Sequence, residues 1–233
     1  MKQIDLPYFD ERSAKIDMII VHCVAHDIKG AIESFKRFEV SPHYLIDEKG
    51  KIYQFVAEYK RAWHAGQSFW QGKNNLNNNS IGIELCSKSF GQEAYPPAQI
   101  SALVRLCQRL KRKYHIKKTS ILGHFDIAPT RKADPGKAFP WSYLARHGLG
   151  IWYDVKNAKK VDVDDEKELL SDIGYDVSDL MAAKWAFIRH FMGQYVPDDT
   201  VENLEKKPYP EKINVPQDEF LNVLTAVWIE ADK

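Results

Sequence analysis

Three polar residues stand where short apolar segments end, and their types suit a metal ion. His22 closes the apolar segment 16–23, His124 follows the segment 119–122, and Asp134 lies in a proline-bounded loop beyond it. Two imidazoles and one carboxylate leave a fourth tetrahedral position open, as in catalytic zinc sites. Taken singly, each histidine could also be an ordinary partly buried side chain and Asp134 a turn former. The spacing alone therefore leaves both interpretations open.

Glu84 and Lys132 add groups that could do chemistry beside such an ion. Glu84 lies in segment 80–85, whose other residues are apolar or small. Burying a carboxylate is costly without a partner, and partial burial raises its pKa toward the range of a general base. Lys132 lies two residues before Asp134, where its ammonium could stabilise an oxyanion. The alternatives are a solvent-facing glutamate on an edge strand and a solvated lysine on a basic loop.

The elements that position these residues follow from the spacing of apolar side chains. Strands are expected over 16–23, 80–85 and 119–122, with a hairpin over 43–56 that turns at Gly50. Helices are expected over 28–38 and 97–114, with a loop over 74–80 and an irregular stretch over 125–141. Strands that alternate with helices indicate an α/β fold, a mixed central β-sheet flanked by helices.

The last third of the chain has a different character. Residues 156–168 are dominated by Asp, Glu and Lys, and apolar residues then recur at helical spacing near 169–175, 180–191 and 219–229. We therefore expect a catalytic domain over 1–155, a linker over 156–164 and a small all-α domain over 165–233.

Composition excludes several classes of protein. Thirty-three basic and 32 acidic side chains leave a formal charge of +1, which argues against a nucleic-acid partner. No apolar run reaches the roughly 18–20 residues of a membrane span. The three cysteines imply no disulfide framework, and residues 1–15 lack the apolar core of a secretory signal. A cytoplasmic location is the expectation from these features.

Five sequence strings carry a resemblance to a known family. They are VHC at 21–23, SPHYLID at 41–47, AWHAG at 62–66, NNNSIGIEL at 77–85 and GHFDIAPTRKADPG at 123–136. In this order they resemble the zinc-dependent N-acetylmuramoyl-L-alanine amidases of type 2, a superfamily that includes the AmpD-type amidases and the peptidoglycan recognition proteins. Residues 165–233 are similar, more weakly, to the helical peptidoglycan-binding-like module of some longer members.

The resemblance implies a role for each matching residue. His22, His124 and Asp134 would bind one Zn²⁺, and Asp at 134 matches the bacterial amidases, whereas recognition proteins typically carry Cys there. Glu84 would be the catalytic carboxylate and Lys132 the electrostatic partner of the oxyanion. His64 and Asn77 would line the substrate groove.

The implied reaction is hydrolysis of the amide between N-acetylmuramic acid, or its 1,6-anhydro form, and L-alanine in peptidoglycan or muropeptides. The main alternative is a non-catalytic peptidoglycan-recognition protein, which typically has lost part of the ligand set. A structural zinc protein is disfavoured because such sites usually have four Cys or His ligands. The resemblance leaves open a periplasmic location, the oligomeric state, and whether the C-terminal module binds cell wall or serves packing or dimerisation.

Overall fold

Parallel strands form the centre of the sheet in the computed structural model, which describes residues 2–159 and 165–232. Strand β3 (Met18–Val24) pairs in parallel with β9 (Ser80–Cys86) and with β10 (Ile121–Gly123), and β9 pairs in parallel with β4 (Tyr44–Ile46). These strands are buried on both faces, as expected for parallel strands covered by helices. The mixed α/β architecture predicted from the sequence is confirmed.

The sheet is completed by shorter strands on the side of β4. The predicted hairpin is present, with β5 (Ile52–Gln54) antiparallel to β4, and β1 (Lys2–Gln3) pairs in parallel with β5. The resulting order is β1-β5-β4-β9-β3-β10. Gly50, in the turn of the hairpin, has a φ of 77°, which is why glycine is favoured there.

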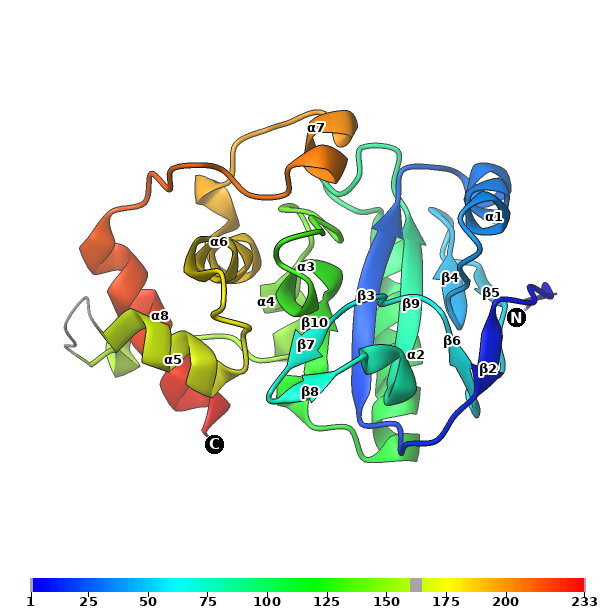
Figure 1. The fold of residues 1–233 in the computed structure, drawn as a ribbon, viewed down its shortest axis with the longest axis horizontal. Helices are drawn as coiled ribbons and strands as arrows, with labels where there is room; N and C mark the ends of the chain where they lie inside the picture. The colour runs from blue at the N-terminus through cyan, green and yellow to red at the C-terminus, as the bar shows by residue number, and fades with distance from the viewer. Residues whose placement is uncertain (1, 160–164, 233) are drawn as a thin grey trace.

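Helix α2 (Pro97–Tyr114) covers one face of the sheet, behind β3 and β9 in Figure 1. Its apolar residues repeat at three- and four-residue spacing and are buried, whereas its basic residues stay on the outer side. Helix α1 (Ile28–Arg37) follows the carboxyl end of β3 and begins where the Asp27 side chain accepts a hydrogen bond from the Gly30 amide.

The stretch after β10 is more regular than the sequence indicated. Residues His124–Ile127 form a short helix, α3, and Trp141–Arg146 form α4. Helix α3 begins at His124, directly after its N-cap Gly123, whose amide donates a hydrogen bond to the carboxylate of Asp126. This turn places His124 at the end of a buried strand.

A second correction concerns the predicted loop over 74–80. Strand β7 (Phe69–Trp70) forms a small antiparallel pair with β8 (Lys73–Asn74), and Leu76–Asn78 form the 3₁₀ helix η1. The stretch that was expected to form only a loop also contributes to the interior, since Leu76 and Asn77 are buried. Another small pair joins β2 (Phe9–Glu11) to β6 (Lys60–Ala62).

The C-terminal third is helical, as predicted. Its helices are α5 (Glu166–Ile173), α6 (Leu180–Phe191), α7 (Val201–Lys206) and α8 (Gln217–Ala231). It also contains the 3₁₀ helix η5 (Gly193–Tyr195). Two further 3₁₀ helices, η2 (Lys118–Ser120) and η3 (Val155–Asn157), lie earlier in the chain. Of the expected linker, residues 156–159 are described and 160–164 lie outside the described residues.

One continuous apolar core joins this helical third to the sheet. It includes Ile20 and Leu122 of the strands together with Leu170, Tyr175 and Phe187 of the helical third. The division of the chain into separate domains stays a prediction. Among the described helices, none combines the length and hydropathy needed to cross a membrane.

Candidate metal and catalytic centre

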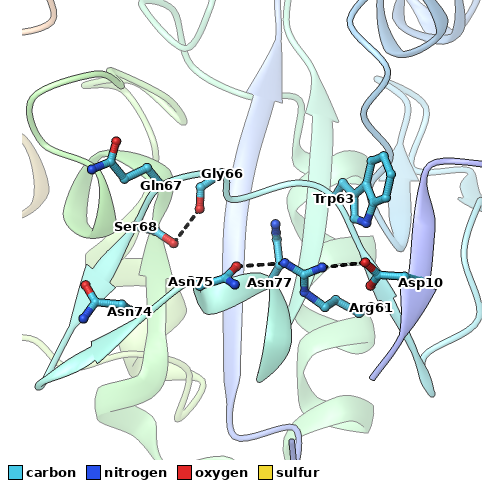
Figure 2. Close-up of a pocket in the computed structure, with 9 residues that line it drawn as sticks. All are labelled: Asp10, Arg61, Trp63, Gly66, Gln67, Ser68, Asn74, Asn75 and Asn77. Carbon is cyan, nitrogen blue, oxygen red and sulfur yellow. Dashed lines mark hydrogen bonds and ion pairs between the residues drawn. The ribbon is translucent and has the colours of Figure 1, made fainter. Parts of the chain in front are cut away.

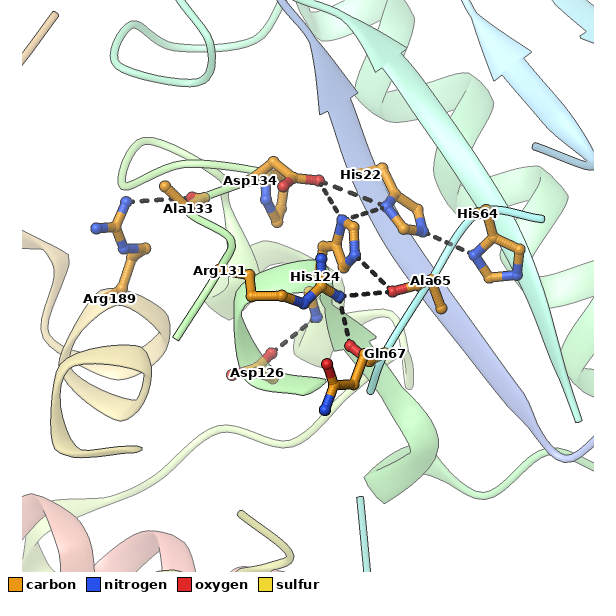
Figure 3. Close-up of polar contacts among 12 residues, drawn as sticks. His22, His64, Ala65, Gln67, His124, Asp126, Arg131, Ala133, Asp134 and Arg189 are labelled. Atoms are coloured by element: carbon orange, nitrogen blue, oxygen red, sulfur yellow. Dashed lines mark hydrogen bonds and ion pairs between the residues drawn. The ribbon is translucent and has the colours of Figure 1, made fainter. Parts of the chain in front are cut away.

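His22, His124 and Asp134 converge at the edge of the sheet where its parallel strands end (Figure 3). His22 is near the end of β3, His124 opens α3 directly after β10, and Asp134 lies in the following loop. The His22 Nδ1 atom lies 2.9 Å from His124 Nδ1 and 3.4 Å from Asp134 Oδ2, and the last two atoms are 3.1 Å apart. All three residues are buried. The structure therefore brings together the three predicted ligands.

The outer ring nitrogens have partners of their own. His124 Nε2 lies 3.1 Å from the Ala65 carbonyl oxygen, to which it donates, so its Nδ1 is left as an acceptor. His22 Nε2 lies 3.0 Å from His64 Nδ1. Outer hydrogen bonds of this kind fix the ring orientation of metal-binding histidines. The two inner Nδ1 atoms and the carboxylate oxygen thus form a cluster of acceptors that suits a cation.

The donor set fits zinc in both type and spacing. Zinc–nitrogen bonds of about 2.0–2.1 Å in tetrahedral geometry place neighbouring ligand atoms roughly 3.3–3.4 Å apart. The three observed separations, 2.9, 3.1 and 3.4 Å, approach this value. Two imidazoles with one carboxylate also match the ligand number of catalytic zinc sites.

The pKa shifts of His22 and Asp134 favour the protonation states that bind a cation. Burial, together with the neighbouring His124, lowers the pKa of His22 to about 4, so that its imidazole is neutral at physiological pH. Burial by itself would raise the pKa of Asp134, but the adjacent His124 and His22 outweigh it and hold that pKa well below its usual range. Neutral imidazoles and an ionised carboxylate are the forms that bind a metal.

Glu84 lines the same pocket as His124 and Asp134. It is the register partner of His22 across β3 and β9, so both side chains leave the same face of the sheet. Its Oε2 atom is enclosed and has no hydrogen-bond partner within the described part of the chain. Burial, and secondarily the charge of Asp134, raises the pKa of Glu84 well above its ordinary value. A carboxylate in this state suits proton transfer.

Lys132 lines the same pocket as Glu84 and Asp134. Its backbone amide bonds to the Ala128 carbonyl, which fixes the turn that carries it. This pocket, which we call the catalytic pocket, has a volume of about 560 Å³. Its lining includes two of the predicted metal ligands, His124 and Asp134. Glu84 and Lys132 therefore line one pocket together with the predicted ligands His124 and Asp134.

The side chains of His64 and Asn77 have different surroundings. His64 lines the catalytic pocket, and its ring packs so closely over Gly82 that a Cβ there would lie 2.4 Å from the ring. The Asn77 side-chain oxygen instead accepts hydrogen bonds from the amides of His64 and Ala65, at 3.0 and 2.7 Å. Asn77 thus holds the backbone of the segment that carries His64.

A second pocket of about 620 Å³ is lined by Trp63 and Gly66 of this segment and by Asn77 (Figure 2). Its lining residues include Asn77 with neighbouring amides and an ion pair between Arg61 and Asp10. Trp63, which is 37% exposed, lines both pockets. The segment 63–66 therefore separates two hollows that share one aromatic side chain.

Other pocket residues were not found by sequence reasoning. They are His26, Arg37 and Phe38 near α1, Arg131 beside Lys132, and Leu204 and Glu205 on α7. Arg131 donates hydrogen bonds to the carbonyls of Ala65 and Gln67, and so ties the ligand loop to the His64 segment. Arg131 could have been identified from the sequence, because it is the residue directly before Lys132. Nothing in the sequence indicated that α7 reaches this pocket.

Comparisons with known proteins agree with this chemistry. Residues 12–137 match the N-acetylmuramoyl-L-alanine amidase family. The N-acetylmuramoyl-L-alanine amidase AmiD of Escherichia coli (strain K12) is 36% identical over 207 residues, which cover 76% of this chain and 75% of that protein. The structure of E. coli AmiD in complex with anhydro-N-acetylmuramic acid-L-Ala-D-gamma-Glu-L-Lys superposes with a TM-score of 0.75 at 30% identity, covering 93% and 91% of the two chains. AmpDh3 from Pseudomonas aeruginosa gives a TM-score of 0.76 at 27% identity over 97% of each chain.

Proposed function

The chain belongs to the N-acetylmuramoyl-L-alanine amidase family, and we propose that it is a zinc-dependent member of it. The reaction is hydrolysis of the amide bond between N-acetylmuramic acid, or its 1,6-anhydro form, and L-alanine. The observation that supports the zinc-dependent mechanism best is the cluster of His22, His124 and Asp134 together with Glu84, whose buried Oε2 atom has no hydrogen-bond partner among the described residues.

His22, His124 and Asp134 would hold the ion, since His22 Nδ1, His124 Nδ1 and a carboxylate oxygen of Asp134 already face one another. A zinc ion bound there supplies Lewis acidity, which polarises a carbonyl group and makes a water molecule more acidic. Ala65 keeps the His124 ring in place through its carbonyl oxygen, at 3.1 Å from Nε2. The chain thus provides a rigid three-ligand site.

Glu84 carries out the proton transfer. Its carboxylate accepts a proton from the water that attacks the amide carbon, and then delivers that proton to the nitrogen of the departing L-alanine, so the C–N bond breaks as an amine leaves. The raised pKa of Glu84 suits both halves of this transfer, because the group must bind the proton and release it again. Enclosure of Oε2 keeps competing hydrogen bonds away from it.

Lys132 stabilises the negative charge that develops on the amide oxygen. It shares the pocket with Glu84 and Asp134, and its charge acts on Glu84, where it opposes the rise in pKa. A fixed cation near a developing oxyanion stabilises the transition state more than the ground state.

We propose muramoyl peptides as the substrate class. E. coli AmiD, similar to this chain over most of its length, was solved with an anhydro-N-acetylmuramic acid peptide. The catalytic pocket offers cationic side chains, Arg37, Arg131 and Lys132, that suit the carboxylates of a stem peptide. A non-catalytic recognition protein would need neither an unpartnered carboxylate nor a complete ligand set.

The test compares Glu84→Gln with the wild-type protein after loading with zinc. We expect release of L-alanine-terminated peptide from purified muropeptides to fall about 10²–10⁴-fold, while zinc content stays at one ion per chain. Glu33→Gln, an exposed change on α1, is the matched control and keeps full activity. Full activity of Glu84→Gln, or a wild-type protein that retains no zinc, contradicts the proposal.

A further inference from the structure

A buried polar cluster outside the catalytic pocket connects the ligand-bearing segment to the C-terminal helices. We call it the Asp126 cluster, and it consists of Asp126, Tyr175 and His190. The Tyr175 hydroxyl donates to Asp126 Oδ1 at 2.8 Å, and His190 Nδ1 lies 2.8 Å from Asp126 Oδ2. Asp126 is 0% exposed. None of these side chains takes part in the proposed chemistry.

Asp126 also holds the turn on which a predicted zinc ligand sits. Its Oδ2 atom accepts a hydrogen bond of 2.7 Å from the Gly123 amide, one residue before His124. A buried carboxylate needs several donors to offset its desolvation, and two of those available here come from the C-terminal third. The orientation of α3 therefore depends on Tyr175 and His190, which lie 49 and 64 positions after Asp126 in the sequence.

A second contact reaches the other end of the ligand segment. Arg189 of α6, only 2% exposed, donates to the Ala133 carbonyl oxygen at 3.1 Å, directly before Asp134. Its other terminal nitrogen donates to the Pro208 carbonyl at 2.7 Å, which fixes the chain after α7. One arginine thus connects the Asp134 loop to the segment that follows α7.

Packing supports the same connection. The His190 ring stacks on Trp141 with ring centroids 4.0 Å apart, and Tyr175 packs edge-on against Trp70 at 4.8 Å. Helix α7 lies at the edge where β3 and β9 end, and its Leu204 and Glu205 line the catalytic pocket (Figure 1).

We propose that residues 165–232 are part of the catalytic unit: Tyr175, His190 and Arg189 are positioning residues for the zinc ligands His124 and Asp134, and α7 forms a wall of the substrate pocket. The inference rests on the proposed zinc site. A wall-binding module on a tether would make no hydrogen bonds to the ligand segment, whereas here such bonds reach both of its ends.

The first test measures zinc affinity by competition with a chromogenic chelator in full-length variants. We expect Tyr175→Phe and His190→Leu to weaken zinc binding about 10–100-fold, the range found for residues that orient metal ligands. His190→Asn, which keeps a donor near the Nδ1 position, restores affinity to within about threefold of the wild type. The melting temperature of the zinc-free protein is recorded alongside.

Tyr209→Phe is the matched control for Tyr175→Phe. Tyr209 donates to Asp179 at 2.8 Å within the helical third, so the change removes the same kind of hydrogen bond without touching the ligand segment. Zinc affinity is expected to stay at the wild-type value. If Tyr175→Phe and His190→Leu lower only the zinc-free melting temperature and leave zinc affinity unchanged, the positioning role is wrong. Absence of zinc binding in the wild type would instead overturn the proposed function itself.

The second test concerns the pocket wall. Glu205 is exposed, so Glu205→Ala leaves the fold intact, and we expect KM for a soluble muropeptide to change at least threefold with kcat nearly constant. Glu202→Ala, on the same helix but outside the pocket lining, is expected to change neither. An unchanged KM in Glu205→Ala overturns the assignment of α7 to the pocket.

Discussion

The side chains of His22 and Glu84 leave the same face of the sheet from adjacent parallel strands, because their Cα atoms are register partners across β3 and β9. Neighbouring strands lie about 4.8 Å apart, so a metal ligand and a proton carrier are set side by side by backbone hydrogen bonds. The distance between them is a property of the most buried part of the sheet, not of a loop.

The zinc-free Glu84→Gln variant should be more stable than the zinc-free wild type at neutral pH. Burial raises the pKa of Glu84, so its ionised form destabilises the folded state above the ordinary pKa of about 4.5. We expect a gain of about 1 kcal/mol, or 2–4 °C in melting temperature, in chelator-treated protein at pH 7–8. Below the ordinary pKa, both states bind the proton and the two melting temperatures converge. A wild type that is more stable than the variant at pH 8 would contradict the assigned burial of this charge.

Removal of zinc should lower the melting temperature of the wild-type protein. Free zinc at 100 times its Kd adds about 2.7 kcal/mol to the free energy of unfolding, which corresponds to roughly 5–10 °C for a chain of this size. Differential scanning fluorimetry with and without a chelator measures the difference. Asp134→Asn removes one ligand charge and should respond little to the chelator. Equal responses of the two proteins would remove Asp134 from the ligand set.

Much of the site could be predicted because strand ends are visible in the sequence. The apolar segments before His22 and His124 indicate buried strands, and parallel strands end at one edge of a sheet, so their following residues meet. Within β9, Glu84 and Gly82 lie on the face opposite to Ile83, because successive residues of a strand point to opposite faces. The register that pairs His22 with Glu84 has no local signal, since the two strands are far apart in the chain.

The parts that were not predicted depend on contacts between distant segments. Leu204 and Glu205 belong to a helix of six residues, and the segment after this helix is held by the hydrogen bond from Arg189 of α6 to the Pro208 carbonyl. The asparagine-rich stretch 74–80 looks like a polar loop, yet Asn77 is buried because its side chain caps two backbone amides of the His64 segment. Neither the place of α7 nor the burial of Asn77 can be derived from the amino-acid composition.

Gly82→Ala should move the His64 ring. A Cβ at position 82 would lie 2.4 Å from the ring, whereas its backbone conformation is open to any residue, so the cost comes from the clash alone. We expect a loss of about 1–3 kcal/mol in the free energy of unfolding. In a His64→Ala background the same change should cost less than about 0.5 kcal/mol, and a double-mutant cycle by urea denaturation measures the coupling. Additive losses would show that another neighbour receives the clash.

Glu58 should govern part of the acid sensitivity of the fold, away from the catalytic pocket. Its carboxylate accepts hydrogen bonds from Tyr44, Arg109, Lys113 and Tyr114. Burial alone would raise the pKa of Glu58, but these donors outweigh it and lower the pKa to about 2. The stabilisation is therefore complete above the ordinary pKa of about 4.5 and is lost as the pH falls toward 2.

Glu58→Gln should accordingly lower the free energy of unfolding by about 1–3 kcal/mol at pH 7, because it leaves Arg109 and Lys113 without their shared anion. The difference from the wild type should shrink as the pH falls from 4.5 to 2, which urea denaturation at several pH values measures. Zinc affinity should stay unchanged, since Glu58 lies outside both the ligand cluster and the catalytic pocket lining. A stability difference that persists undiminished at pH 2 would show that the amide disrupts packing and that the ion pairs are not its cause.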